Sequence, residues 1–261
     1  MLKIEKYVTP SPEQWEIIIE GMRNPMNSWD RMDSYITHIE NPESLNEANF
    51  EFVLGENDAD LMERLAAGGS VHAKYRRMAV VWLTMTAPLY WWKEFDTYKV
   101  GTVCNSCSTM HKIADREFTL EDFLTEHLIG NDIAKDLVNN EVFVPDEEKD
   151  GNIVNWTPLD ILELTIKALN TYREVYLKTK DKKYWWQMIQ LLPSSYNQKR
   201  TVMLNYEVLS EMYKWRKDHK LDEWKIFCHW IEGLPYFDII IDPVKILGVD
   251  LSLSNEKASE E

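Results

Sequence analysis

The sequence predicts an α/β domain in which strands and helices follow one another in mixed order. Residues 78–86 are rich in Val, Leu and Thr, which is typical of a strand. Capping-box patterns begin at Ser11, Thr119 and Thr157, and each marks the start of a helix. No internal repeat and no Ser- or Gly-rich linker divides the chain. We therefore expect one domain over 1–251, followed by a disordered acidic tail over 252–261.

The N-terminal part is expected to form two strands and two helices. Apolar and charged side chains alternate over 2–8, as in a strand. A helix is expected over 12–22, because Pro12 follows the Ser11 cap and suits the first helical position. A second strand is expected at 50–54. Apolar spacing then predicts a helix over 58–67, which ends at a Gly-Gly pair.

In the middle of the chain, the strand at 78–86 is followed by segments of less regular pattern. Pro88 to Tyr98 suits a helix, and 102–111 suits a loop that leads into an extended segment. The Thr119 box predicts a helix to about Leu128, and a further helix is expected over 131–139. An acidic connection completes a stretch at about 113–157 that looks like an insertion.

The C-terminal part is expected to be mostly helical. The Thr157 box opens the longest helix, over 158–178, and the next helix stops at Pro193. Asn205 is expected to cap a helix over 206–217, and Asp222 a helix to about 232. A last strand is expected at 236–241.

Charge and cysteine content exclude several classes of function. Acidic residues outnumber basic ones by 44 to 29, which gives a formal charge of −15 and argues against binding a nucleic acid polymer. The three cysteines do not form a disulfide framework, and the pair Cys104 and Cys107 has no second pair, so we predict no metal site. No stretch approaches the ~20 apolar residues of a membrane span, and the N-terminus has no signal core. We expect no membrane partner and a cytoplasmic location.

Polar side chains concentrate in three segments that are separated in the sequence: Lys99 to His111, Leu191 to Thr201, and Asn205 with Trp215 to Lys220. The first follows Trp91 and Trp92. Aromatic side chains beside hydrogen-bonding groups are typical of surfaces that bind a planar, polar ligand. A buried helix followed by a capped loop is the alternative interpretation.

The last of these segments contains the densest positive cluster of this acidic chain, Arg216, Lys217, His219 and Lys220. An arginine fork recognises phosphate or carboxylate well. Alternatively, these cations compensate the dipole at a helix C-terminus. The chain has no G-x-S-x-G, G-x-G-x-x-G, Walker A or H-E-x-x-H motif. His72 lies shortly after a Gly-Gly turn, and a histidine at such a position can have a structural role instead of a catalytic one.

Taken in order, these segments resemble the flavin-dependent thymidylate synthase family. KIEKYVTPSPEQWEIIIEGMR resembles its opening strand, T-P-x-P-E turn and first helix, and AAGGSVHAKY resembles its G-H-x-S-x-x-E-H segment, with His72 in place of the final His. NSCSTMH is similar to N-E-x-S-x-R-Y, with matches at Asn105 and Ser108. The stretch from MIQLLP to LDEW is similar to A-R-x-V-L-P and the segments after it. Its matches are Leu192, Pro193, Thr201, Asn205 and Arg216.

The departures concern groups that bind anions. The family's R-H-R is here Thr97-Tyr98-Lys99, with one extra residue before Asn105. Two further family arginines are replaced by Ile189 and Glu207. Each lost charge-assisted hydrogen bond removes about 1.5–3 kcal/mol, so the ordinary substrate would bind poorly unless Lys99, Lys199 or Arg200 substitute.

The resemblance implies a central, mostly antiparallel sheet flanked by helices, assembled as a homotetramer with flavin sites between subunits. It implies a flavoprotein and methyltransferase that methylates dUMP reductively with methylenetetrahydrofolate, FAD and NADPH. The residues implied for FAD are His72, Tyr98, Lys99 and Asn205. Those implied for a nucleotide are Asn105, Ser108, Arg200 and Arg216, with Arg216 and Ser108 also in the catalytic role.

Three hypotheses follow. The protein is an FAD-dependent enzyme that transfers a one-carbon unit to a pyrimidine nucleotide, or a non-catalytic module of the same fold that binds or sequesters a nucleotide. The third hypothesis is an interaction protein whose polar segments serve assembly. The excess of tryptophan favours a homo-oligomer in each case, because Trp is enriched in interface cores.

Overall fold

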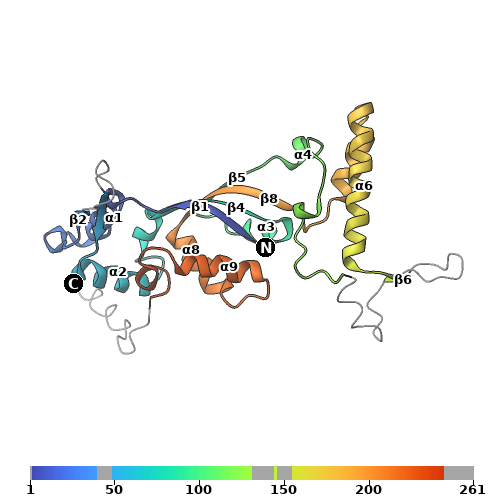
Figure 1. Cartoon of the computed structure of the whole chain (residues 1–261). Helices are drawn as coiled ribbons and strands as arrows, with labels where there is room; N and C mark the ends of the chain where they lie inside the picture. Colours follow the sequence, from blue (N-terminus) through green and yellow to red (C-terminus); the bar gives the residue numbers. More distant parts are fainter. Residues whose placement is uncertain (1, 40–48, 131–143, 146–154, 244–261) are drawn as a thin grey trace, which may run out of the picture. The chain divides into compact units, whose positions relative to one another are not determined.

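The computed structural model describes residues 2–39, 49–130, 144–145 and 155–243 (Figure 1). The chain forms two compact units, each built from several segments. The first unit is Met1–Lys3, Thr86–Phe95 and Ser106–Arg200, and the second is Ile4–Met85, Asp96–Asn105 and Thr201–Glu261. That the chain is a single domain over 1–251 with an insertion at about 113–157 stays a prediction. The tail at 252–261 lies outside the described residues.

The chain contains a four-stranded antiparallel sheet. Its strand order is β1 (Lys3–Val8), β4 (Val80–Pro88), β8 (Asn197–Asn205) and β5 (Thr102–Ser106). Along β4, Val81, Leu83, Met85 and Ala87 are buried, whereas Trp82 is exposed. This alternation is the period-two pattern of a sheet with one covered face. The predicted α/β class, with a central antiparallel sheet flanked by helices, is confirmed.

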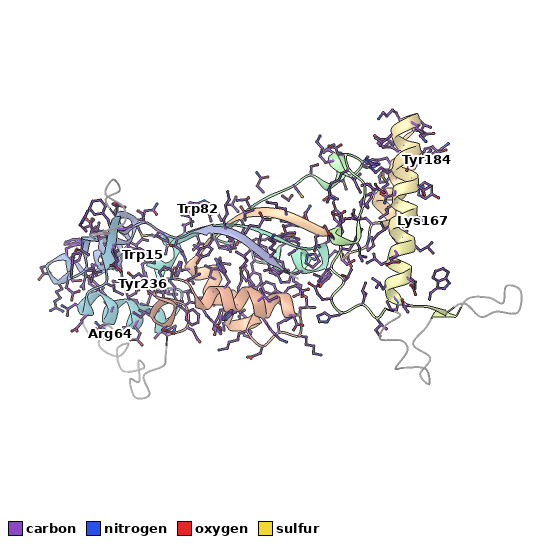
Figure 2. All side chains as sticks on the ribbon, viewed as in Figure 1. Trp15, Arg64, Trp82, Lys167, Tyr184 and Tyr236 are labelled. Atoms are coloured by element: carbon purple, nitrogen blue, oxygen red, sulfur yellow. The ribbon has the colours of Figure 1, made fainter. Side chains whose placement is uncertain are left out.

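The second unit packs helices around an aromatic core. It contains α1 (Pro12–Arg23), β2 (Tyr35–Ile39) paired antiparallel with β3 (Asn49–Val53), and α2 (Glu56–Ala67). It also contains α8 (Tyr206–Arg216), α9 (Asp222–Glu232) and α10 (Phe237–Ile240). Trp15 of α1 contacts Tyr206 edge-on, at a ring-centroid distance of 5.7 Å. It contacts Tyr236 in the same way at 5.0 Å, and Figure 2 labels these two residues. Such T-shaped pairs add to the stabilisation that burial gives.

The first unit contains both short and long helices. α3 (Leu89–Phe95) is short and aromatic, and α4 (Thr109–Lys112) is a single turn. The long α6 (Pro158–Thr179) packs against α7 (Lys182–Leu191), and the strand pair β6 (Val144–Pro145) and β7 (Asn155–Trp156) precedes α6. Residues of the segment 113–123 pack with α6 and α7 in an apolar core that includes Ile113, Phe118, Leu162, Leu169 and Met188.

The predicted caps form largely as expected. Ser11 accepts a hydrogen bond from the backbone N of Gln14 at 3.3 Å, and Thr157 closes a full capping box with Asp160. Asn205 caps α8 by accepting from the backbone N of Val208 at 3.0 Å. The prediction that Asp222 caps α9 is wrong, because Leu221 occupies the cap position and Asp222 is the first helical residue.

Several predicted segments have a different structure. The segment 102–111, expected as a loop, begins with the strand β5 and contains most of the single turn α4. The Thr119 box closes, but it leads into one 3-10 turn, Leu120–Asp122, and Phe123 then forms an extended bridge with Tyr196. The segment 236–241, predicted as a strand, contains α10, because Tyr236 adopts a left-handed φ of 59° and its carbonyl accepts from Ile240 N at 2.9 Å. The predicted helix at 131–139 lies outside the described residues.

Candidate functional site

The two tryptophans that suggested a ligand surface lie in the core of the first unit. Trp91 and Trp92 each have 0% exposure, and their ring centroids are 5.0 Å apart. The indole nitrogen of Trp92 donates to the backbone oxygen of Gln198 at 2.9 Å. The hypothesis that they form a ligand platform is therefore wrong for both residues, and the buried-helix interpretation is correct for α3.

Arg200, a predicted nucleotide ligand, is held by the same core. Its guanidinium carbon lies 4.2 Å from the centroid of the Trp92 ring, and its Nε donates to Oε1 of Gln198 at 2.9 Å. Successive side chains of a strand point to opposite faces of the sheet. Arg200 thus shares a face of β8 with buried Gln198, whereas Asn197 and Lys199 point to the other face.

On that other face, a cavity of about 460 Å³ opens beside Ser108. Two of the three predicted polar segments meet here, because the backbone N of Cys107 donates to the backbone oxygen of Lys199 at 3.0 Å. Gln198 reinforces the junction by donating to Oγ1 of Thr109 at 2.9 Å. Ser108 caps α4 by accepting from the backbone N of His111 at 3.2 Å. The cavity is lined by polar residues that include Thr86, Ser108, Lys112, Arg116, Asp122, Tyr196, Asn197 and Lys199.

The charges around this Ser108 cavity are mixed and partly paired. Nζ of Lys112 lies 2.9 Å from Oδ2 of Asp115, and Arg116 forms a bidentate ion pair with Asp122. The hydrogen bond from Arg116 to Asp122 raises the pKa of Arg116. Burial raises the pKa of the Tyr196 hydroxyl, which therefore stays protonated and able to donate.

One polar atom at the cavity lacks a hydrogen-bond partner. Within the described part of the chain, Oδ1 of Asn197 is buried and accepts no hydrogen bond. Asn197 also lines the cavity. A buried acceptor without a donor costs about 1–3 kcal/mol, which a ligand that donates a hydrogen bond would recover.

Arg216 contacts two aromatic side chains of the second unit, Tyr98 and Trp224. Its Nε donates to the hydroxyl of Tyr98 at 2.9 Å, and its guanidinium carbon is 5.6 Å from the Tyr98 ring and 4.8 Å from the Trp224 ring. The structure therefore joins two predicted site residues, Tyr98 and Arg216, which are 118 positions apart in the sequence.

Asn205 is engaged in the fold. Besides capping α8, its backbone N donates to the Gly101 oxygen at 3.3 Å. Gly101 has a φ of +76°, and a Cβ atom there would lie 2.5 Å from Nδ2 of Asn205. Nearby in sequence, Glu207 stands where the resemblance has an arginine. Its carboxylate lies 3.9 Å from the buried guanidinium of Arg76, so the charge at this position is reversed and internally paired.

The other predicted site residues lie on the surface. His72, Lys99, Asn105 and Ser108 are all exposed. The backbone N of His72 donates to Gly69 at 3.0 Å, which continues the turn after α2. Among the predicted residues, Ser108 and Arg200 belong to the first unit and the others to the second.

The sequence analysis missed several lining residues of the Ser108 cavity, among them Lys112, Arg116 and Asp122. The Thr119 capping box pointed to Asp122, but as a helix-capping group. Nothing in the sequence indicated that Arg116 would pair with it. Among the described residues, no group of three or more His, Cys, Asp and Glu side chains could hold a metal ion. Likewise, no helix in the described ranges is long and apolar enough to span a bilayer.

Comparison with known proteins identifies the fold through structure. No protein-family model matches the chain, and no curated protein matches it in sequence. Thymidylate synthase X from Helicobacter pylori, solved with FAD and dUMP, is similar with a TM-score of 0.55 and 14% identity, over 92% of this chain and 96% of that chain.

Two further solved structures agree. A second complex of the Helicobacter pylori enzyme with FAD and dUMP gives a TM-score of 0.52 at 13% identity, over 92% of this chain and 97% of that one. A UMP/dUMP methylase, PolB from Streptomyces cacaoi, bound with 5-Br dUMP, gives a TM-score of 0.51 at 13% identity, over 92% of this chain and 90% of that chain. The chain therefore has the fold of the flavin-dependent thymidylate synthases, and the resemblance is confirmed at the level of the fold.

Proposed function

We propose that the protein binds a pyrimidine nucleotide such as dUMP, with the Ser108 cavity as its binding site. The observation that carries this proposal is the buried, unpartnered Oδ1 of Asn197 in a cavity lined by hydroxyl groups and cations. A uracil ring presents an N–H donor between two carbonyl acceptors. The amide of Asn197 offers the complementary acceptor and donor side by side.

The phosphate of such a ligand would be bound by cations at the same cavity. Lys199 lines it, and Lys112 and Arg116 lie at exposed positions beside it. The hydroxyls of Ser108 and Thr109 supply further hydrogen bonds. Solved structures of the same fold hold dUMP or 5-Br dUMP, which supports this ligand class.

The binding test is isothermal titration of the full chain with dUMP. Replacing Lys199 by Gln should weaken binding about tenfold, because a charge-assisted hydrogen bond contributes about 1.5–3 kcal/mol. Lys167→Gln is the matched control, since Lys167 is an exposed lysine of α6 in the same unit (Figure 2). Equal affinities of both variants, or no binding at millimolar dUMP, would refute the proposal.

The residues implied for FAD fit that cofactor poorly in this chain. Asn205 is engaged as a cap, and Tyr98 accepts a hydrogen bond from Arg216. Glu207 stands where the resemblance has an arginine and is paired with Arg76, so this position offers no positive charge to a pyrophosphate. We therefore assign no chemical step to a flavin and favour a nucleotide-binding or sequestering module over a methyltransferase.

The second candidate function is FAD-dependent transfer of a one-carbon unit to the nucleotide. The observation in its favour is that structures of this fold were solved with FAD and dUMP together. Flavin absorbance of the purified protein, or a stable yellow complex after titration with FAD, would support it. If the protein is colourless, and its melting temperature rises with dUMP but not with FAD, the non-catalytic binding module is favoured instead.

We also propose a homo-oligomer, in keeping with the tetramer that the resemblance implies. The long helix α6 carries several exposed apolar side chains, Ile161, Leu164, Tyr172 and Leu177. Apolar side chains that stay exposed along one element are typical of an interface. A monomeric mass by light scattering at micromolar concentration would contradict this proposal.

A further inference from the structure

A second polar cavity, of about 520 Å³, lies within the second unit and is distinct in its residues from the Ser108 cavity. It opens where α1 ends and α2 begins, and its lining includes three arginines in a chain that is acidic overall: Arg23, Arg31 and Arg64. Asn27, Ser28 and Asn57 supply neutral hydrogen-bonding groups at the same cavity.

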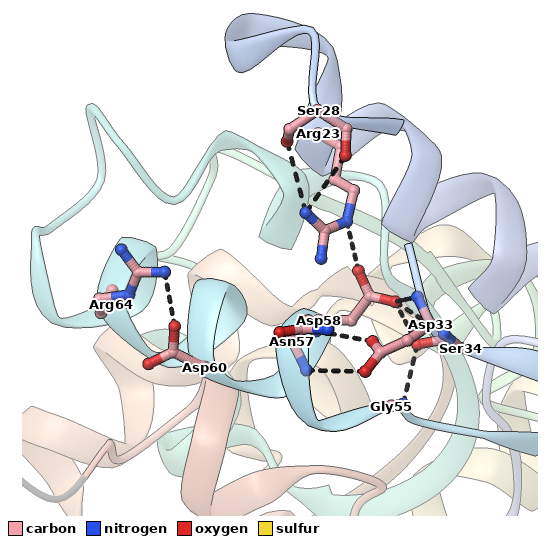
Figure 3. Close-up of polar contacts among 9 residues, drawn as sticks. All are labelled: Arg23, Ser28, Asp33, Ser34, Gly55, Asn57, Asp58, Asp60 and Arg64. Carbon is pink, nitrogen blue, oxygen red and sulfur yellow. Dashed lines mark hydrogen bonds and ion pairs between the residues drawn. The ribbon is translucent and has the colours of Figure 1, made fainter. Parts of the chain in front are cut away.

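Arg23 is the buried member of this set, with 2% exposure. Its Nε donates to Oδ1 of Asp58 at 2.5 Å, and its Nη1 donates to the backbone oxygen and to Oγ of Ser28, both at 3.3 Å (Figure 3). The remaining nitrogen, Nη2, is buried and has no acceptor among the residues that the structure describes. A guanidinium has five N–H donors, so two of them remain unused here.

The carboxylate of Asp58 accepts hydrogen bonds both from Arg23 and from the segment that contains Asp33 and Ser34. Its Oδ2 accepts from the backbone N of Asp33 at 3.0 Å, and from N and Oγ of Ser34 at 2.8 and 2.6 Å. Three donors thus stabilise the carboxylate independently of Arg23. Asp58 engages only Nε of Arg23, so the two N–H groups of the buried Nη2 are the donors that remain available to an anion in the cavity.

From these observations we propose that this cavity binds the phosphate group of a small molecule, with Arg23 as its buried anchor. Arg31 and Arg64 would bind the outer oxygens. Asp60 holds Arg64 at 2.5 Å, but both side chains are exposed, and exposed pairs contribute little. A phosphate can therefore replace Asp60 as the partner of Arg64. Asp30 and Asp60 line the same cavity, so the bonds to the arginines must offset their electrostatic repulsion.

Inorganic phosphate is the probe that tests the site. Titration of the full chain at constant ionic strength should give saturable binding, and the melting temperature should rise with phosphate but not with an equivalent concentration of sodium chloride. Arg31→Gln combined with Arg64→Gln should weaken phosphate binding at least about tenfold, because two charge-assisted bonds are lost. Both residues are exposed, so the double variant should fold.

Two controls make the outcome specific. Arg77→Gln removes an exposed arginine of the same unit that does not line the cavity, and it should leave the phosphate affinity unchanged. Lys199→Gln impairs the Ser108 cavity, so phosphate that binds there would be lost in this variant and retained in the double arginine variant. Loss of phosphate binding in Lys199→Gln but not in the double arginine variant would overturn the inference. Equal stabilisation by phosphate and chloride would overturn it as well.

Discussion

Arg216 and Tyr98 are joined by a hydrogen bond of 2.9 Å from the guanidinium to the phenol. The same guanidinium lies 4.8 Å from the ring of Trp224, and the rings of Tyr98 and Trp224 are themselves in edge-on contact, with centroids 6.0 Å apart. Arg216 was predicted from the sequence as a ligand of an anion. In the folded chain it also connects the end of α8 to the segment before β5.

The first prediction concerns this connection. Arg216→Ala should lower the free energy of unfolding by about 1–2 kcal/mol, because a hydrogen bond from a charged donor and a cation–π contact are both lost. Tyr98→Phe, which keeps the ring and removes the hydroxyl, should cost about 0.5–1.5 kcal/mol. Urea unfolding at pH 7 measures both. If Arg216→Ala leaves the free energy of unfolding unchanged, Arg216 does not stabilise the fold and its role is limited to binding a ligand.

The second prediction compares two glycines with positive φ. Gly101→Ala should lower the free energy of unfolding by more than about 2 kcal/mol, because the backbone strain of about 1–2 kcal/mol adds to a clash with Asn205. Gly69 has a φ of +85° but nothing within 4 Å of its Cβ position, so Gly69→Ala should cost only the strain. Equal losses in thermal unfolding would contradict the close approach of Gly101 to Asn205.

The third prediction concerns acid stability and Asp58. Burial alone would raise the pKa of Asp58, but the hydrogen bonds from Ser34, Arg23 and Asp33 outweigh burial and lower it below its ordinary value. A carboxylate with a lowered pKa stabilises the fold above the pKa of the unfolded chain, and this contribution is lost as the pH falls through the folded pKa. Stability should therefore drop below about pH 4.

Asp58→Asn is the variant that isolates this contribution. It should be less stable at pH 7 and should lose part of the wild-type dependence on pH between about 5 and 2. Asp60→Asn is the control, because Asp60 is exposed and forms a surface pair with Arg64. Chemical unfolding across this pH range compares the three proteins. Parallel curves for wild type and Asp58→Asn would refute the role assigned to Asp58.

The fourth prediction separates the three thiols. Cys104 and Cys107 are exposed, whereas Cys228 is buried and burial raises its pKa to about 12. The thiolate is the reactive form, so Cys228 should react with a thiol reagent far more slowly than the other two. A spectrophotometric thiol assay should show two fast equivalents in the folded protein and a third after denaturation. Three equivalents of similar rate would contradict the burial of Cys228.

The sequence was most informative where the determining contacts are local. Ser11, Thr157 and Asn205 cap the helices expected of them, because a cap depends on backbone groups within three residues. Periodicity likewise placed the long helix α6 correctly, with a last residue one position from the expected end. The order of motifs indicated the fold, which structural comparison then confirmed.

Errors arose where a distant partner decides the structure. The segment after Asp122 becomes extended because Phe123 bridges to Tyr196, more than 70 positions away. Trp91 and Trp92 have the composition of a ligand surface, yet β8 covers Trp92 through Gln198 and Arg200. The pairing of Arg116 with Asp122 depends on the turn at 120–122, whose geometry the sequence does not specify.

The alternation along β8 has a consequence for how this protein can change over evolution. Asn197 and Lys199 face the Ser108 cavity, while Gln198 and Arg200 face the core, and a shift of one residue would exchange the two sets. Such a shift would place Lys199 against Trp92 and would move Arg200 from the core face into the cavity. Residue types on the cavity face are therefore free to diversify with the ligand, whereas the number of residues between Pro193 and Asn205 should stay constant among related chains.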